Sequence, residues 1–133
     1  DNETRDIWKA WGGLNSIQYF LPMMFDMVVH QKNLSPTLIA KVMDYNPAKI
    51  FGFYGRKGAF ELGFDGDVVI LDPEKEWKCE QDKLYTKGHV SCFDGFEGKG
   101  TPTCTIIRGR VVAKDGKYLE EANGYGEYVT PIQ

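Results

Sequence analysis

The chain has 133 residues and a net charge of −3, with 42% hydrophobic and 26% charged residues. These values are typical of one globular domain that is large enough to bury a core. Lys and Arg are scattered, which excludes the clustered basic footprint of a nucleic-acid-binding protein. No apolar run approaches the roughly 18 residues that a membrane-spanning helix needs. We therefore expect neither nucleic acid nor a membrane as a partner.

The first residues indicate whether the chain is a fragment, and the cysteines indicate its redox compartment. The chain opens with the polar stretch DNETRD, which is no signal peptide and has no initiator Met, so we expect a fragment or a processed product. The three cysteines, Cys79, Cys92 and Cys104, form no Cys-x-x-Cys pair. Their odd number favours free thiols in a reducing compartment, and we expect the cytoplasm. A Cys92–Cys104 disulfide is the alternative.

A helical pattern runs from Gly13 to about Phe53. Apolar residues recur at spacings of four, three and four, which predicts one face of a helix. The internal Pro22 removes a backbone donor, so we expect the helix to kink or restart there. The predicted face comprises Ile17, Leu21, Met24 and Val28.

Two further helices are predicted. Ser35 is placed as an N-cap with Pro36 at the first helical position. A third, short helix is expected to be capped by Asn46, opened by Pro47 and ended by Gly52. The apolar face of the second helix comprises Leu38, Ile39, Val42 and Met43.

Strands are predicted in the second half of the chain. The β-branched run at 67–72, bounded by Pro73, indicates a buried strand. Two more strands are expected at 103–109 and 110–118, the latter with a turn at Asp115-Gly116. The tail, GYGEYVTPIQ, is either a last short strand or a docked extension. The charged run DPEKEWKCEQDK alternates in sign and is expected to be a solvated face or loop. Helices followed by strands predict an α+β fold.

Few residues suggest chemistry on their own. His30 and His89 are the only histidines, and without an HxH or HExxH spacing they are better explained as structural. Asp65 and Asp67 could form an acid–base pair, but Asp beside Gly at the start of a strand is more typical of a turn. Cys92 with His89 could form a nucleophile pair, although residues three apart on a strand face opposite sides.

Four stretches resemble a known family. They are WGGLNSIQYFLPMMFD, YNPAKIFGF, KGAFELGFDGDVVILDP, and TCTIIRGRVV preceded by SCFDGFEGKG. In this order and at these spacings, the chain resembles the C-terminal portion of the cyclic amidohydrolases, which comprise the dihydroorotases, hydantoinases and allantoinases. KAWGG and SCFDGFEGKG are most similar to allantoinase. The chain departs from the family pattern at Ala59 and Gly66, which are packing positions.

The resemblance implies a fold and a division of the chain. Residues 1–56 would be the last helical segment of a (β/α)8 barrel. Residues 57–133 would be a β-rich composite domain, a small β-sandwich built from both chain ends. The resemblance further implies a homo-oligomer, a tetramer in the family.

The resemblance also implies a chemistry that this chain holds only in part. The family uses two bridged divalent metals of the zinc type, whose bound hydroxide attacks the ring amide while an Asp moves the proton. No position here matches those ligands or that Asp, so we expect no catalytic and no metal-binding residue in this chain. The expected substrate contacts are Trp11, Gly12 and Gly13, although Trp11 could instead pack on the barrel rim.

The predicted function is that of a parent enzyme that hydrolyses the ring amide of allantoin to allantoate. A hydantoinase (dihydropyrimidinase) or dihydroorotase is the first alternative. A non-catalytic scaffold of the same family is the second, and the residues upstream of this chain would discriminate between enzyme and scaffold.

Overall fold

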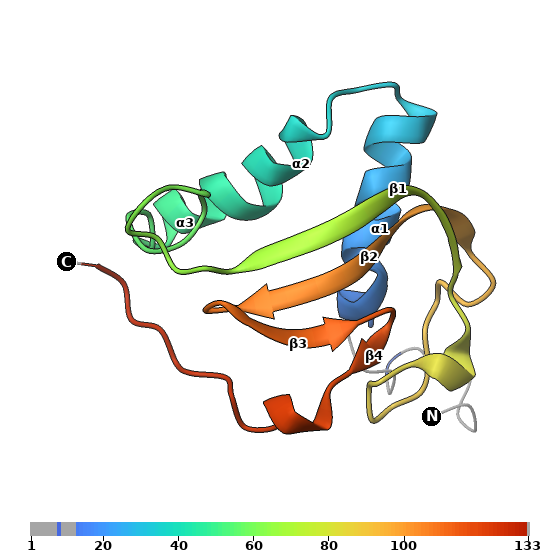
Figure 1. Ribbon diagram of the computed structural model, residues 1–133. Coiled ribbons are helices and arrows are strands. Elements are labelled where there is room, and N and C mark those ends of the chain that lie inside the picture. Colours follow the sequence, from blue (N-terminus) through green and yellow to red (C-terminus); the bar gives the residue numbers. More distant parts are fainter. Residues whose placement is uncertain (1–7, 9–12, 133) are drawn as a thin grey trace.

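Two helical runs open the part of the chain that the computed structural model describes, which is Trp8 and residues 13–132 (Figure 1). The first run consists of α1 (Ile17–Phe25) and a π-helical turn at Asp26–Gln31. The second run consists of α2 (Thr37–Ala40), a π-helical turn at Lys41–Tyr45 and α3 (Asn46–Ile50).

The first helical run passes Pro22 without interruption. Pro22 lies inside α1 and is buried, and the change of hydrogen bonding to the π pattern comes only at Asp26. Of the two outcomes expected at Pro22, the restart is therefore wrong. One missing backbone donor is outweighed by the packing of the helix on the sheet. The placement of Ile17 on the buried apolar face is also wrong, since its side chain is 93% exposed.

The second helical run has one confirmed start and one confirmed end. The Ser35 hydroxyl accepts a hydrogen bond from the Thr37 N–H (3.3 Å), as an N-cap does. At the other end, Gly52 has φ +73, and Phe53 N–H donates to the Ala48 carbonyl (2.7 Å). This 6→1 bond is the signature of a Schellman motif, which needs a residue with positive φ.

Asn46 is not a cap, contrary to the prediction. Both Tyr45 and Asn46 have right-handed helical dihedrals, and no side-chain capping bond is present at this point. The π-helical turn carries the chain directly from α2 into α3, so Asn46-Pro47 lies within a continuous helical run. The Asn-Pro pair therefore marks a change in helix type and not a helix start.

Four antiparallel strands form the sheet in the order β1-β2-β3-β4. They are β1 (Val68–Lys78), β2 (Glu97–Ile107), β3 (Arg110–Lys114) and β4 (Lys117–Tyr118). The turns Arg108-Gly109 and Asp115-Gly116 each have two consecutive positive φ values, which a type I′ hairpin requires. The predicted Asp-Gly turn is confirmed.

Strand β1 is longer and more exposed than predicted. It continues through Pro73 to Lys78, because the pairing register shifts between Asp72 and Glu76 and a missing N–H costs nothing there. Part of the charged run, expected as a solvated face or loop, is thus strand. Val69 and Ile70 are 46% and 51% exposed, so the expectation of a buried strand is wrong. No described segment covers these two side chains.

Hydroxyl groups of β2 bridge both irregularities of the β1–β2 ladder. Thr103 donates to the Ile70 carbonyl (3.2 Å), where the first register shift begins. Thr101 donates to the carbonyl of Lys75 (2.9 Å), inside the second shift. These side chains satisfy carbonyls that the regular ladder leaves without a partner.

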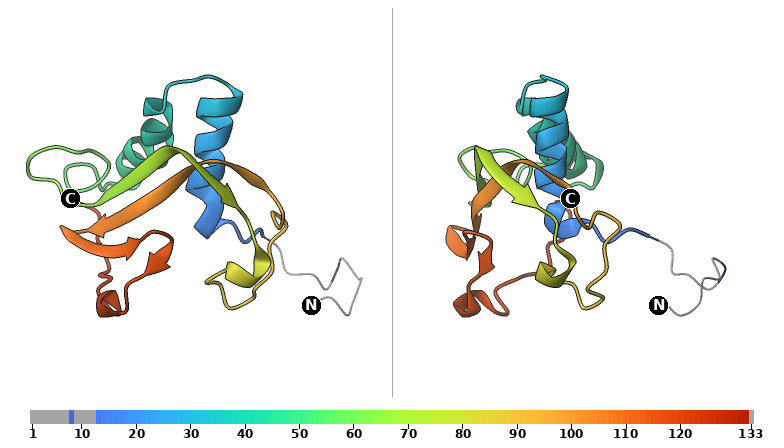
Figure 2. Two further views of the ribbon diagram at one scale, coloured as in Figure 1. Left: turned by 45° about the vertical axis from the view of Figure 1, so that its right-hand side comes forward. Right: turned by 90° about the vertical axis from the view of Figure 1, so that its right-hand side faces the viewer.

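The core lies between the helices and β1–β2. Phe25, Val28 and Ile39 are buried together, and Leu71 of β1 packs against them. The helices pack on one side of β1 and β2, with α1 crossing these strands, and β3 and β4 extend the sheet away from them (Figures 1 and 2). The mixed helix and sheet composition of the α+β prediction is therefore confirmed.

The C-terminal tail is the docked extension of the two forms predicted. The Ile132 N–H donates to the Gly52 carbonyl (2.8 Å), at the end of α3. Along the way the guanidinium of Arg108 lies over the ring of Tyr125, 4.4 Å from its centroid.

Over the described residues, we find no helix with the length and apolarity needed to cross a bilayer.

At Gly100 the helix and the sheet approach each other closely. Its φ is +98, and a Cβ there would lie 2.2 Å from Cδ1 of Phe25. We expect Gly100→Ala to destabilise the protein by about 1–3 kcal/mol through overpacking, beyond about 1–2 kcal/mol of backbone strain. Equilibrium unfolding in urea measures this cost. Gly63→Ala is the matched control, because Gly63 has φ +93 and an added Cβ there would meet no described atom within 4 Å. Equal costs for both variants would contradict the packing argument.

Candidate functional site

Of the three residues expected to touch substrate, Gly13 alone lies in the described part of the chain. Trp11 and Gly12 lie outside the described residues. Gly13 is exposed, has φ +106, and would have no described atom within 4 Å of an added Cβ. This backbone conformation favours glycine, which adopts positive φ without strain.

A hollow of about 380 Å³ lies next to this stretch. It lies beside the contact between the start of α1 and the loop that joins β1 to β2. Its lining residues are Asn15, Ile17, Gln18, Tyr85 and Thr86. Ile17 and Tyr85 are both exposed, at 93% and 67%. The hollow is therefore open to solvent, with an apolar surface beside amide groups.

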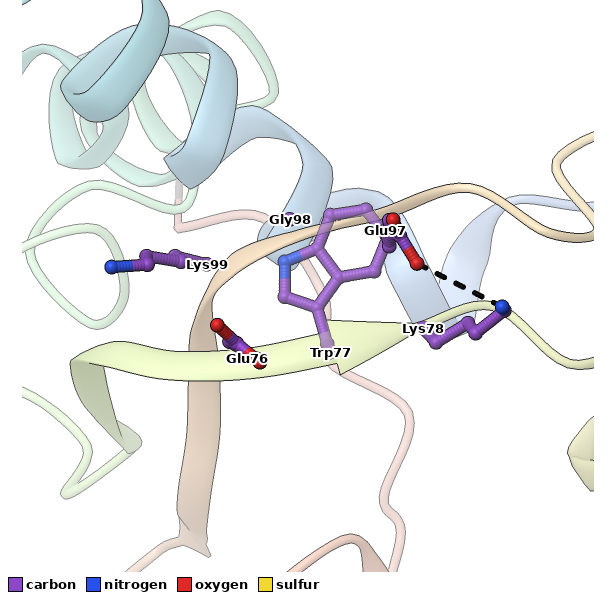
Figure 3. Close-up of a pocket in the computed structure, with 6 residues that line it drawn as sticks. All are labelled: Glu76, Trp77, Lys78, Glu97, Gly98 and Lys99. Carbon is purple, nitrogen blue, oxygen red and sulfur yellow. Dashed lines mark ion pairs between the residues drawn. The ribbon is translucent and has the colours of Figure 1, made fainter.

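A second hollow, of about 460 Å³, is lined by residues 76–78 of β1 and residues 97–99 of β2, which pair with each other in the sheet (Figure 3). Trp77 reaches across it to Gly98, where a Cβ would lie 2.9 Å from the indole. The indole Nε1 is buried and has no hydrogen-bond partner among the described residues. The remaining lining is two Glu and two Lys, of which Lys78 and Glu97 form an ion pair (3.7 Å). This balanced charge gives the hollow no preference for an anion or a cation.

Asp65 and Asp67 form ion pairs and are not an acid–base pair. Asp65 binds Arg56 (2.8 Å) and Lys57 (2.7 Å), and Lys57 also binds Asp67. Asp67 further accepts the Arg108 N–H (2.8 Å). The ammonium of Lys57, together with the guanidinium of Arg56, holds the pKa of the Asp65 carboxyl below its usual range. A carboxylate in this state stabilises the loop 51–67 and is a poor general acid.

The histidines and cysteines do not form a nucleophilic site. His30 Nε2 bonds the Pro73 carbonyl (2.9 Å), which ties the helix end to β1, and His89 is exposed. All three cysteines are free thiols, as expected. Cys79 is fully buried, and this burial raises the pKa of its thiol.

Metal ligands do not come together in the described part of the chain. Over Trp8 and residues 13–132, no three side chains of His, Cys, Asp or Glu are grouped so that they could hold a metal ion. The described residues therefore do not fit a binuclear metal centre.

Polar residues at the start of α1 are functional candidates that the sequence pattern does not single out. Asn15, Gln18 and Tyr19 all hydrogen-bond to backbone groups of residues 78–90. The helical periodicity emphasises the apolar positions of this helix and leaves its polar positions aside. The signal that could have found them is their place directly after Gly12-Gly13, with Asn15 just before α1 and Gln18 and Tyr19 in its first turn.

The Asp65 ion pairs make stability depend on pH. A carboxyl whose pKa is lowered in the folded state adds stability above its unfolded value, about 3.9. That contribution is lost as the pH falls through the lower folded-state pKa. We expect Asp65→Asn to lower the melting temperature at pH 7, and to differ less from wild type as the pH falls from about 5 to 3. Glu61→Gln is the control, an exposed carboxylate of the same loop without an ion pair to a described residue. A constant difference across this range would contradict the assignment.

Comparisons with known proteins give this chain a family. Residues 5–112 match the model of the Amidohydrolase family. L-hydantoinase of Paenarthrobacter aurescens is 38% identical over 95% of this chain and 27% of its own length. Allantoinase of Rubrobacter xylanophilus is 33% identical over 95% of this chain and 27% of its own length.

A solved structure agrees with these matches. The structure of L-hydantoinase (dihydropyrimidinase) from Arthrobacter aurescens aligns with a TM-score of 0.81 and 38% identity, over 86% of this chain and 25% of that one. This chain thus spans about a quarter of the length of the curated relatives that it matches. Since the family model covers well over half of its residues, the chain belongs to the amidohydrolase family.

Proposed function

We propose that this chain is part of a cyclic amidohydrolase that opens the five-membered ring of allantoin to give allantoate. In this reaction water adds to a ring amide carbon, the carbon–nitrogen bond breaks, and a carboxylate and an N–H group result. The observation that carries the proposal is the order of four motifs along the chain, together with matches to a hydantoinase and an allantoinase over 95% of its residues.

The chain's proposed place in the enzyme follows from what it contains. Residues 1–56 are proposed to be the last helical segment of a (β/α)8 barrel, and residues 57–133 the β-rich composite domain. A binuclear centre of divalent metal, of the zinc type, is proposed to come from residues outside this chain. The three free cysteines support a reducing compartment such as the cytoplasm. The assembly is proposed to be a homo-oligomer, a tetramer.

The residues proposed to hold substrate are Trp11, Gly12 and Gly13. A hydantoin-type ring carries alternating N–H and C=O groups along its edge. Peptide groups at two consecutive glycines can donate and accept in the same alternation. The indole of Trp11 would cover the ring face and exclude water. The positive φ and the open surroundings of Gly13 support this arrangement.

Hydantoin is the second candidate substrate. The higher identity to an L-hydantoinase (38%) than to an allantoinase (33%) favours it. The two substrates share one ring and differ in the substituent at its carbon 5, which is a ureido group in allantoin. The KAWGG and SCFDGFEGKG stretches favour the ureido group by their resemblance to allantoinase.

A substrate panel tests the proposal directly. The full-length protein is assayed for ring opening of allantoin, hydantoin and dihydroorotate, and its metal content is measured. We expect bound divalent metal and the highest kcat/KM on allantoin. A higher kcat/KM on hydantoin or dihydroorotate would replace allantoin as the proposed substrate and leave the proposed cyclic amide hydrolysis in place. Metal-free protein that opens none of the three rings would support the alternative of a non-catalytic scaffold.

Trp11 gives a specific prediction within this panel. We expect Trp11→Ala in the full-length enzyme to lower kcat/KM by about tenfold or more, since a misplaced substrate loses near-attack geometry. Metal content is expected to stay unchanged. Phe60→Ala, the removal of an exposed aromatic ring from the loop 51–67, is the control and should leave kcat/KM as it is. Unchanged kinetics for Trp11→Ala would mean that this side chain only packs on the barrel rim.

A further inference from the structure

The connection between β1 and β2 is a compact loop with its own core. Its two ends are joined, since the Cys79 N–H donates to the Phe96 carbonyl (2.7 Å) and the Gly95 N–H to the Cys79 carbonyl (2.8 Å). Cys79, Leu84 and Ser91 are buried at 0%, 6% and 8% exposure. A surface loop with closed ends and internal packing is an Ω-loop, and such loops frequently serve function.

This Ω-loop, residues 79–96, holds the start of α1. Gln18 uses both ends of its amide, because Nε2 donates to the Lys83 carbonyl (3.2 Å) and Oε1 accepts the Tyr85 N–H (2.9 Å). Asn15 also makes two bonds to the Ω-loop. Its side-chain Nδ2 donates to the Val90 carbonyl (3.1 Å), and its backbone carbonyl accepts the Ser91 hydroxyl (3.2 Å).

The Ω-loop is itself fixed on the sheet. The Tyr85 hydroxyl donates to the Gly116 carbonyl and accepts the Tyr118 N–H, both at 3.4 Å. Tyr19 adds a bond to the Lys78 carbonyl (3.1 Å), where β1 passes into the loop. The Ω-loop and the start of α1 lie side by side in both views (Figures 1 and 2).

These contacts are directional and bury little. Ile17, between the two anchored side chains, stays 93% exposed, whereas Phe25 at the far end of α1 is buried in the core. Hydrogen bonds add little net stability but fix orientation, because they weaken steeply when misaligned. The helix is therefore held on the sheet at its end and oriented by the Ω-loop at its start.

We propose that the Ω-loop positions the glycine stretch that binds substrate, with Asn15 and Gln18 as the positioning residues. Asn15 lies two residues after Gly13, so the Cα atoms are at most about 7.6 Å apart. Fixing Asn15 on both its side chain and its carbonyl restricts the orientation of the backbone at Gly13, the described residue of that stretch. Residues remote in sequence thereby set the geometry of ring binding. This inference rests on the proposed function.

The test compares two glutamines of the same helical run in the full-length enzyme. Gln18→Ala removes both bonds to the Ω-loop. Gln31→Ala is the matched control, since Gln31 donates to Asp26 (2.7 Å) at the opposite end of the run. Amide hydrogen exchange of the peptide 9–16 and kcat/KM on the preferred ring are measured for both variants. Gln18→Glu, which keeps the acceptor for the Tyr85 N–H, replaces Gln18→Ala if that variant does not fold.

We expect Gln18→Ala to speed exchange in the peptide 9–16 and to lower kcat/KM about tenfold, mainly through KM and with metal content unchanged. Gln18→Glu, which loses the bond to the Lys83 carbonyl, should change both measurements in the same direction, and Gln31→Ala should alter neither. Exchange that stays at the wild-type rate in Gln18→Ala overturns the proposal. So does faster exchange with unchanged kinetics.

The two proposals can fail separately. Wild-type protein that opens none of the three rings overturns the proposed function. The exchange comparison then still decides whether the Ω-loop holds the glycine stretch.

Discussion

The contact between Phe25 and Gly100 is the constraint on which the rest of the structure depends. The ring lies so close to the β2 backbone that a single methyl group at position 100 would overlap it. One residue further along, Asp26 accepts the Lys99 N–H (2.9 Å), so the same short segment is fixed by packing and by a hydrogen bond. With this point fixed, the first helical run can bring its other end to the Ω-loop, and the second run can close the core through Ile39.

The fold could be predicted from the sequence where local chemistry decides the conformation. Gly52 ends its helix and Asp115-Gly116 makes its turn, because only a few residue types adopt positive φ readily. The errors share a different cause. Local rules predict boundaries at Pro22, Asn46 and Pro73, yet all three lie inside helical runs or strands. At each point tertiary packing, a π-helical turn or a register shift accommodates the local defect, and no short-range pattern reveals this.

The candidate site could be predicted only in part, and for a physical reason. Trp11, Gly12 and Gly13 follow from resemblance to a family, since glycines beside an aromatic residue have no chemistry that spacing alone identifies. The Ω-loop that holds the start of α1 beside this stretch is harder to predict. The Ω-loop includes only the end of the alternating charged run, and its bonds to Asn15 and Gln18 are mostly made by its backbone. Backbone groups leave no trace in residue type, so the sequence does not show them.

The bond between Ile132 and Gly52 has a consequence for how this sheet could vary among related chains. It returns the end of the described chain to the end of α3, and the whole sheet with its Ω-loop lies within the ring so formed. Closing a ring costs entropy that grows only with the logarithm of its length, about 0.6 kcal/mol for each doubling. Lengthening the Ω-loop by several residues would therefore cost little. The ring thus allows the segment beside the glycine stretch to change in size and shape, while the helices, which precede the ring in the chain, stay as they are.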